Sequence, residues 1–126
     1  MKCSDFTILI GEDHPGEQKI YQKALSKEGY RLILAESGAE ILDELNNSRV
    51  DLLITDLEMK PMSGLDALSI IKKRHPALSI IVVSGYYKGM VENFNGKAIL
   101  IDAFIEKPVS LPVFKKKIRE VLNISE

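Results

Sequence analysis

Short apolar segments alternate with longer amphipathic segments along the chain. The apolar segments are rich in Ile, Leu and Val, and they are FTILIG (6–11), LILAE (32–36), VDLLIT (50–55), LSIIVVSG (78–85) and the weaker AFIEK (103–107). Three of them show little polar alternation, which is typical of strands that are buried on both faces. The pattern therefore predicts five β-strands.

The longer segments have the apolar spacing of helices. Their apolar residues recur every three or four positions, at Ile20, Tyr21, Ala24, Leu25, Ile41, Leu42, Leu45, Leu65, Leu68, Ile71, Leu111, Phe114, Ile118 and Leu122. Pro15 and Gly29 mark the two ends of the first helix, and His75-Pro76 closes the third. We expect Ser37, which has a glutamate at capping-box spacing, and Ser110 to cap the second and last helices.

The regular alternation of strand and helix predicts the fold class. It favours an α/β fold with a doubly wound, five-stranded parallel sheet, because each crossover between parallel strands must carry a helix. We expect a flavodoxin-like strand order of 2-1-3-4-5 and five helices. The fourth helix should be short or irregular, because residues 86–101 contain two glycines and two asparagines that weaken a helix.

Length, charge and cysteine content narrow the class of protein. A chain of 126 residues is expected to form one domain, residues 1–126. Its formal net charge of -1 gives no indication of binding to nucleic acid or to an anionic membrane. Cys3 is the only cysteine, and no apolar segment approaches the roughly 20 residues of a membrane helix. We therefore expect a cytoplasmic protein without direct contacts to nucleic acid or membrane.

Polar side chains follow four of the predicted strands. The first strand is followed by Glu12-Asp13, the third by Asp56, the fourth by Ser84 and the fifth by Lys107. In an open parallel sheet these positions meet at one edge, where ligands bind. Three carboxylates held together repel one another, so a cation is expected between them, and oxygen ligands favour Mg²⁺.

Such a site is suited to accepting a phosphoryl group. Asp56 would act as the nucleophile, Ser84 would donate a hydrogen bond, and Lys107 and the metal ion would neutralise the phosphoryl oxygens. Each residue alone has an ordinary structural explanation as a turn, cap or surface residue. Their occurrence together at four strand ends favours the functional interpretation.

In these residues the chain resembles the receiver domains of response regulators in two-component signalling. The likeness runs from Glu12-Asp13 through TDLEMKPMSG (55–64) and Ser84-Gly85 to AFIEKP (103–108), and so covers nearly the whole chain. It implies that Asp56 is the phosphoacceptor, with a histidine kinase or phosphotransfer protein as donor. It also implies that Glu12, Asp13, Asp56 and the backbone carbonyl of Glu58 hold Mg²⁺, and that Ser84 and Lys107 bind the phosphoryl oxygens.

The resemblance carries further expectations. Pro108 corresponds to a cis proline after the lysine, and Phe104 to an aromatic residue that moves inward when the hydroxyl of Ser84 turns towards the phosphate. Glu58 and Tyr86 correspond to the positions that set the lifetime of the phosphorylated form. A downstream protein partner is expected to bind around residues 86–120.

Two rival functions differ in class from a phosphorylated switch. The first is a phosphotransferase of the haloacid dehalogenase type, which also uses an aspartyl phosphate; however, Asp56 lies on the third strand and no room remains for a cap domain. The second is a scaffold that works without phosphorylation, although the acceptor, the acidic pair and the lysine are all present. No output module follows the last predicted helix, which suits either a stand-alone receiver or a piece of a longer regulator.

Overall fold

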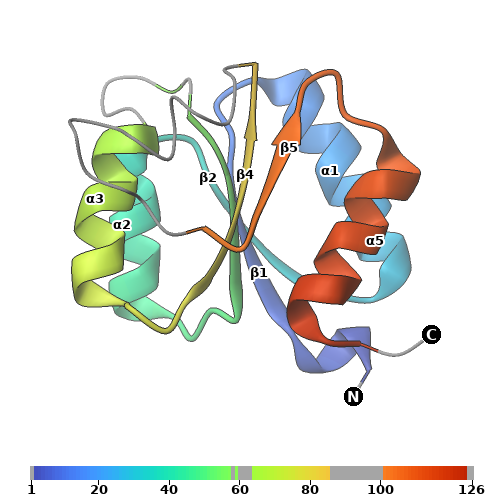
Figure 1. The fold of residues 1–126 in the computed structure, drawn as a ribbon, viewed down its shortest axis with the longest axis horizontal. Coiled ribbons are helices and arrows are strands. Elements are labelled where there is room, and N and C mark those ends of the chain that lie inside the picture. The colour runs from blue at the N-terminus through green and yellow to red at the C-terminus, as the bar shows by residue number, and fades with distance from the viewer. Residues whose placement is uncertain (1, 58, 60–63, 86–100, 125–126) are drawn as a thin grey trace.

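Five parallel strands form the centre of the molecule. The computed structural model describes residues 2–57, 59, 64–85 and 101–124 (Figure 1). The strands are β1 (Thr7–Gly11), β2 (Arg31–Ala35), β3 (Leu52–Asp56), β4 (Ser79–Ser84) and β5 (Ala103–Glu106). They form one sheet in the order β2-β1-β3-β4-β5, and every pairing is parallel. The predicted fold class and strand order are confirmed.

Four α-helices occur within the described residues. They are α1 (Pro15–Glu28), α2 (Gly38–Asn47), α3 (Gly64–Arg74) and α5 (Leu111–Leu122), and a short 3-10 helix, η1 (Cys3–Asp5), precedes β1. The prediction of an irregular fourth helix falls on residues 86–101, which lie outside the described residues except for Ile101. That residue is not helical and leads into β5.

The helices cover the two faces of the sheet in pairs, with α1 and α5 on one face and α2 and α3 on the other (Figure 1). Tyr21 of α1 and Phe114 of α5 pack against each other with ring centroids 5.2 Å apart, within the core on the first face. Ile41 of α2 and Leu68 of α3 belong to the core on the second face. Because both faces of the sheet are covered, the strands are apolar without alternation.

The ends and buried faces of the helices follow their predicted signals with two differences. Gly29 ends α1 with a φ of 101°, a left-handed conformation that glycine adopts without steric cost. Ser37 caps α2 by accepting a hydrogen bond of 3.1 Å from the backbone N–H of Glu40. Ser110 is the N-cap residue of α5, but its side chain makes no capping hydrogen bond. Ile20, predicted on the buried face of α1, is exposed instead, because it lies at the edge of that face.

Close packing around Gly11 fixes the end of β1. A Cβ atom added at Gly11 would lie 2.5 Å from Cδ1 of Ile41 and 2.8 Å from Oγ1 of Thr55. The absence of a side chain therefore lets α2 and β3 approach the last residue of β1. The next residue is Glu12, whose backbone N–H donates to the carbonyl of Ala35 over 2.9 Å.

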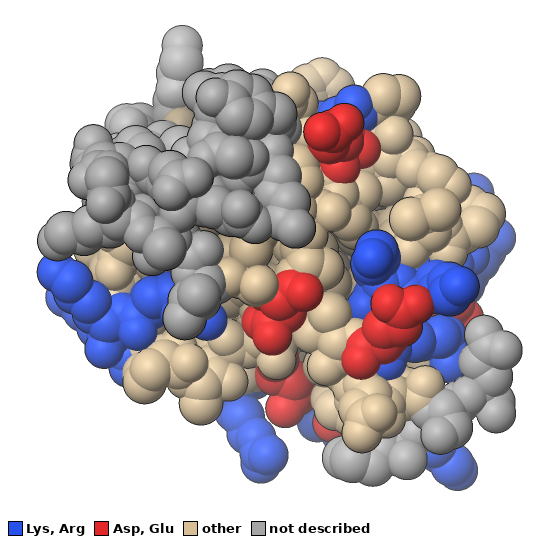
Figure 2. All heavy atoms as spheres, in the orientation of Figure 1, with Lys and Arg blue, Asp and Glu red and all other residues tan. Residues whose placement is uncertain are grey.

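The basic residues of α5 lie on the side of the helix that faces away from the core. Phe114 and Ile118 are fully buried, whereas the lysines at 115–117 are exposed or half-buried, and Arg119 lies 3.6 Å from a carboxylate oxygen of Glu28. Figure 2 shows Lys and Arg side chains interspersed with Asp and Glu on the side of the molecule where α5 lies.

Among the described helices, none is both long enough and apolar enough to cross a lipid bilayer.

Candidate functional site

Four of the predicted site residues lie where the parallel strands end. Gly11 pairs in register with Thr55, Asp56 with Val83, and Ser84 with Glu106. Because the sheet is parallel, the residues that end β3 and β4 and those that follow β1 and β5 lie along one edge. Glu12, Asp56, Ser84 and Lys107 are all located there.

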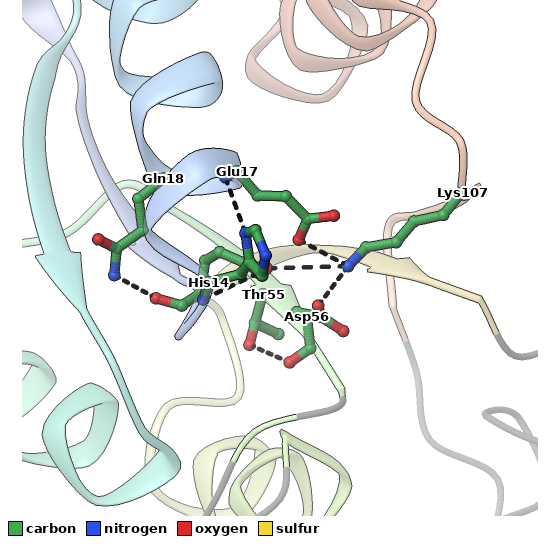
Figure 3. Close-up of polar contacts among 7 residues, drawn as sticks. His14, Glu17, Gln18, Thr55, Asp56 and Lys107 are labelled. Atoms are coloured by element: carbon green, nitrogen blue, oxygen red, sulfur yellow. Dashed lines mark hydrogen bonds and ion pairs between the residues drawn. The ribbon is translucent and has the colours of Figure 1, made fainter.

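Asp56 and Lys107 are in direct contact. The Nζ atom of Lys107 donates a hydrogen bond to Oδ2 of Asp56 over 2.5 Å (Figure 3). Asp56 is only 4% exposed, so its side chain is buried at the end of β3. Its backbone carbonyl accepts a hydrogen bond of 2.8 Å from the hydroxyl of Thr55. The acceptor candidate is therefore fixed on both its side chain and its backbone.

Ser84 and Phe104 belong to the strands beside Asp56. Ser84 is fully buried, and its carbonyl accepts a hydrogen bond of 2.9 Å from the backbone N–H of Lys107. This bond ties the end of β4 to the residue after β5. Phe104 pairs in register with Val82, is half-buried and packs against the core on the α2 and α3 face. The peptide bond between Lys107 and Pro108 is cis, as the resemblance implied.

The three carboxylates that lie together in the structure are not the three that the sequence predicted. Glu12, Glu17 and Asp56 each offer a carboxylate oxygen, and these three atoms lie within 4.8 Å of one another. Asp13 is exposed, and it is not part of this group. Glu17, which sequence reasoning missed, reaches the site from the first turn of α1. A signal for it existed, since a helix that starts four residues after β1 begins at the same edge of the sheet.

Supporting contacts hold the first turn of α1 against the site. The side-chain amide of Gln18 donates to the backbone carbonyl of Glu12, and the backbone N–H of His14 donates to the carboxylate of Glu12 over 3.3 Å (Figure 3). His14 caps α1 by accepting from the backbone N–H of Glu17 over 3.4 Å. His14, Gln18 and Thr55 carry no signal of these roles in the sequence, because the roles depend on neighbours that only the fold brings close.

Burial and neighbouring charged groups shift the pKa values of Glu12, Glu17 and Lys107. Burial raises the pKa of Glu12 to about 9, and hydrogen bonds to Glu17 and Asp56 add to this effect. The hydrogen bond with Glu12 lowers the pKa of Glu17. Burial alone would lower the pKa of Lys107, but its hydrogen bonds to Asp56 and Glu17 outweigh burial and raise it. The lysine is therefore a permanent cation at neutral pH.

The donor set fits a divalent cation. Three carboxylate oxygens within 4.8 Å of one another are hard ligands of the kind that Mg²⁺ prefers. The charge of Asp56 adds to burial in raising the pKa of Glu12, and the charge of Lys107 opposes this rise without cancelling it. Glu58, predicted to contribute a backbone carbonyl to the metal and to influence lifetime, lies outside the described residues. Tyr86, predicted to influence lifetime, also lies outside them.

The fold agrees with known structures. A CheY-like receiver domain from Methanospirillum hungatei is 29% identical, covers 94% of each chain and superimposes with a TM-score of 0.83. The Thermotoga maritima response regulator TrrA, solved in complex with Mg(2+)-BeF, is 28% identical. It covers 96% of this chain and 99% of its own, with a TM-score of 0.80.

Sequence relatives lead to the same family. The response regulator DivK of Brucella anthropi is 29% identical over 122 residues, which are 93% of this chain and 96% of DivK. The transcriptional regulator GlrR of Escherichia coli is 32% identical over 118 residues, but the chain spans only 26% of its length. The family model for the response regulator receiver domain matches residues 8–119. The chain therefore belongs to the response regulator receiver domains of two-component systems.

Proposed function

We propose that Asp56 of this receiver domain accepts a phosphoryl group from a histidine kinase or phosphotransfer protein, in the presence of Mg²⁺. The observation that carries the proposal is the contact of 2.5 Å between Lys107 and the buried carboxylate of Asp56 at the end of β3. Any buried carboxylate is stabilised by a neighbouring cation, but this cation belongs to Lys107, which is 21% exposed and can turn towards an incoming anion. A nucleophile that acquires an anionic group requires such a cation.

The transfer is a displacement at phosphorus. A carboxylate oxygen of Asp56 attacks the phosphorus atom, the phosphorus–nitrogen bond of a phosphohistidine breaks, and its electron pair remains on the imidazole nitrogen. Lys107 moves from the carboxylate to a phosphoryl oxygen, and the hydroxyl of Ser84 donates to another. Both residues therefore stabilise the charge that the transfer brings into the site.

The carboxylates at the strand ends would hold the metal ion. Glu12 and Asp56 offer oxygens from the described site, and Asp13, although exposed here, remains our proposed third side-chain ligand. When bound, Mg²⁺ supplies positive charge that brings the phosphoryl group and the carboxylates together. Glu12 can take part only after it loses the proton that its raised pKa retains.

The signalling output follows from a change in the surface beyond the site. We propose that Phe104 moves towards Ser84 after phosphorylation and shifts an equilibrium between two existing conformations. A downstream protein would bind the changed surface around residues 86–120, of which the structure describes residues 101–120. In this proposal the domain catalyses only its own phosphorylation and dephosphorylation.

The two rival functions are not favoured. A dehalogenase-type phosphotransferase would turn over a phosphomonoester continuously, whereas a receiver takes up one phosphoryl group per chain. Incubation with acetyl phosphate and Mg²⁺, followed by intact-mass measurement and phosphate-release assays, tests this. Uptake of one phosphoryl group is expected. Sustained turnover of a phosphomonoester would favour the enzyme, and absence of uptake from both acetyl phosphate and a phosphohistidine donor would favour the scaffold.

A further inference from the structure

Glu17 and Asp56 both accept hydrogen bonds from the ammonium group of Lys107. The Oε2 atom of Glu17 accepts a hydrogen bond from Nζ of Lys107 over 2.9 Å (Figure 3). Glu12 lies further away, with its Oε2 atom 4.0 Å from the same nitrogen. An ammonium group has three N–H donors, and the contacts with Asp56 and Glu17 use two of them. Lys107 is therefore shared between the end of β3 and the first turn of α1.

We propose that Glu17 is a positioning residue that holds Lys107 in the unphosphorylated state and competes with the phosphoryl group for it. The inference rests on the proposed roles of Asp56 and Lys107. A phosphoryl group on Asp56 brings new oxygens to the place where Lys107 now contacts the carboxylate. Glu17 attracts the same ammonium group towards α1, so its carboxylate opposes the move of Lys107 to these oxygens and thereby opposes the phosphorylated state.

The surroundings give Lys107 room to change partner. Glu17 is 33% exposed and Lys107 is 21% exposed, so neither side chain is locked in the core. A groove of about 240 Å³ lies beside the pair and is lined also by Tyr21, Pro108 and Leu111. The unbranched side chain of Lys107 can therefore move between Glu17 and an anion on Asp56 without disturbing the core.

The proposal predicts opposite effects on an anion and on a cation. Glutamine in place of Glu17 keeps the size of the side chain and removes its charge, so Lys107 becomes more available to a phosphoryl analogue. The same change leaves Asp56 more tightly paired with Lys107 and removes one of three crowded carboxylates. Affinity for beryllofluoride should therefore rise while affinity for Mg²⁺ falls. A general loss of structure would weaken both.

The chain offers a matched control on the same helix. Glu28 at the end of α1 is 26% exposed and lies 3.6 Å from a nitrogen of Arg119. Glu28→Gln therefore changes the same charge and also removes an ion pair, but at a distance from the site. Wild type, Glu17→Gln and Glu28→Gln would be titrated by calorimetry with Mg²⁺ alone and with beryllofluoride at saturating Mg²⁺.

We expect Glu17→Gln to bind beryllofluoride about two- to fivefold more tightly and Mg²⁺ about two- to fivefold more weakly, the range typical of partly exposed charge pairs. Glu28→Gln should match wild type in both. Equal affinities in Glu17→Gln and wild type, or weaker beryllofluoride binding, would overturn the role of Glu17. A wild-type protein that binds no beryllofluoride with Mg²⁺ would instead overturn the proposed function of the site.

A double-mutant cycle tells positioning from simple charge repulsion. In a Lys107→Gln background, titrated to higher beryllofluoride concentrations, Glu17→Gln should have a smaller effect on anion affinity than in wild type, because the shared ammonium is gone. An undiminished effect would show that Glu17 acts on the anion directly, and the positioning role would be wrong. Thermal unfolding of each variant checks that the fold is intact.

Discussion

Nζ of Lys107 lies 2.5 Å from Oδ2 of Asp56, so the contact joins the ends of β5 and β3 across the intervening strand β4. It links residues 51 positions apart in the chain. The geometry exists because all strands are parallel and end at the same edge. A carboxylate and the cation that would later bind its phosphoryl group are therefore paired before any phosphoryl group arrives.

Replacing Asp56 should abolish phosphorylation. Asparagine has nearly the same shape but lacks the anionic oxygen that attacks phosphorus. After treatment with acetyl phosphate and Mg²⁺, Asp56→Asn should gain no phosphoryl mass within the time in which wild type is modified. Asp43→Asn, an equivalent change at an exposed position of α2, should behave as wild type. Uptake by Asp56→Asn at the wild-type rate would show that the acceptor lies elsewhere.

The stability of the metal-free protein should fall as the pH rises from about 4.5 to about 9. The pKa of the Glu12 carboxyl is about 9 in the folded protein, against a usual value of 4.5. The folded state therefore binds more protons than the unfolded state across this window. The stabilisation is fully present below the unfolded pKa and is lost as the pH rises through the folded pKa.

Glu12→Gln should remove most of this slope. Glutamine carries no titrating proton, so the variant should be more stable than wild type at pH 8 by on the order of 1–3 kcal/mol. Denaturant unfolding in EDTA at several pH values measures the effect. Glu36→Gln, at an exposed position, should leave the slope unchanged. Saturating Mg²⁺ should also flatten it in wild type, and a wild-type slope that is already flat in EDTA would contradict the prediction.

Gly11→Ala should destabilise the fold and disturb the site. The added Cβ would lie 2.5 Å from Cδ1 of Ile41 and 2.8 Å from Oγ1 of Thr55, whose hydroxyl holds the carbonyl of Asp56. Such overpacking typically costs about 1–3 kcal/mol. We therefore expect a lower unfolding midpoint and slower phosphorylation of Asp56.

Gly16→Ala is the matched control for that change. A Cβ at Gly16, in the first turn of α1, would meet only side-chain atoms of His14, at 3.2 and 3.3 Å. Alanine is favoured over glycine in helices by up to about 1 kcal/mol, so this variant should be as stable as wild type or slightly more so. Equal stability losses in the two variants would show that packing around Gly11 is not the cause.

Two serines at helix starts should differ in their contribution to stability. Ser37 accepts a hydrogen bond from the backbone of Glu40, so Ser37→Ala should lower the free energy of unfolding by roughly 0.5–2 kcal/mol. The side chain of Ser110 makes no such bond, so Ser110→Ala should have little effect. Chemical denaturation of both variants measures the difference, and a Ser110→Ala loss as large as that of Ser37→Ala would disprove it.

The sequence alone determined the elements and their order. Strands buried on both faces require continuous apolar segments, and helices that cover a sheet require apolar residues every three or four positions. Both patterns are local, so β1 to β5 and the four described helices could be located from the sequence. The same patterns located the strand ends, and with them the position of Asp56, Ser84 and Lys107 along one edge.

Only the tertiary structure decided which side chains meet at that edge. Glu17 joins the carboxylates of Glu12 and Asp56, whereas Asp13 is exposed beside them. The direction of a side chain after a strand depends on the backbone of the turn and on where the next helix is packed, and neither is encoded in residue spacing. Because hydrogen bonds from His14 and Gln18 to Glu12 hold the first turn of α1 at the end of β1, a residue that the sequence assigns to an ordinary helix surface contacts Lys107.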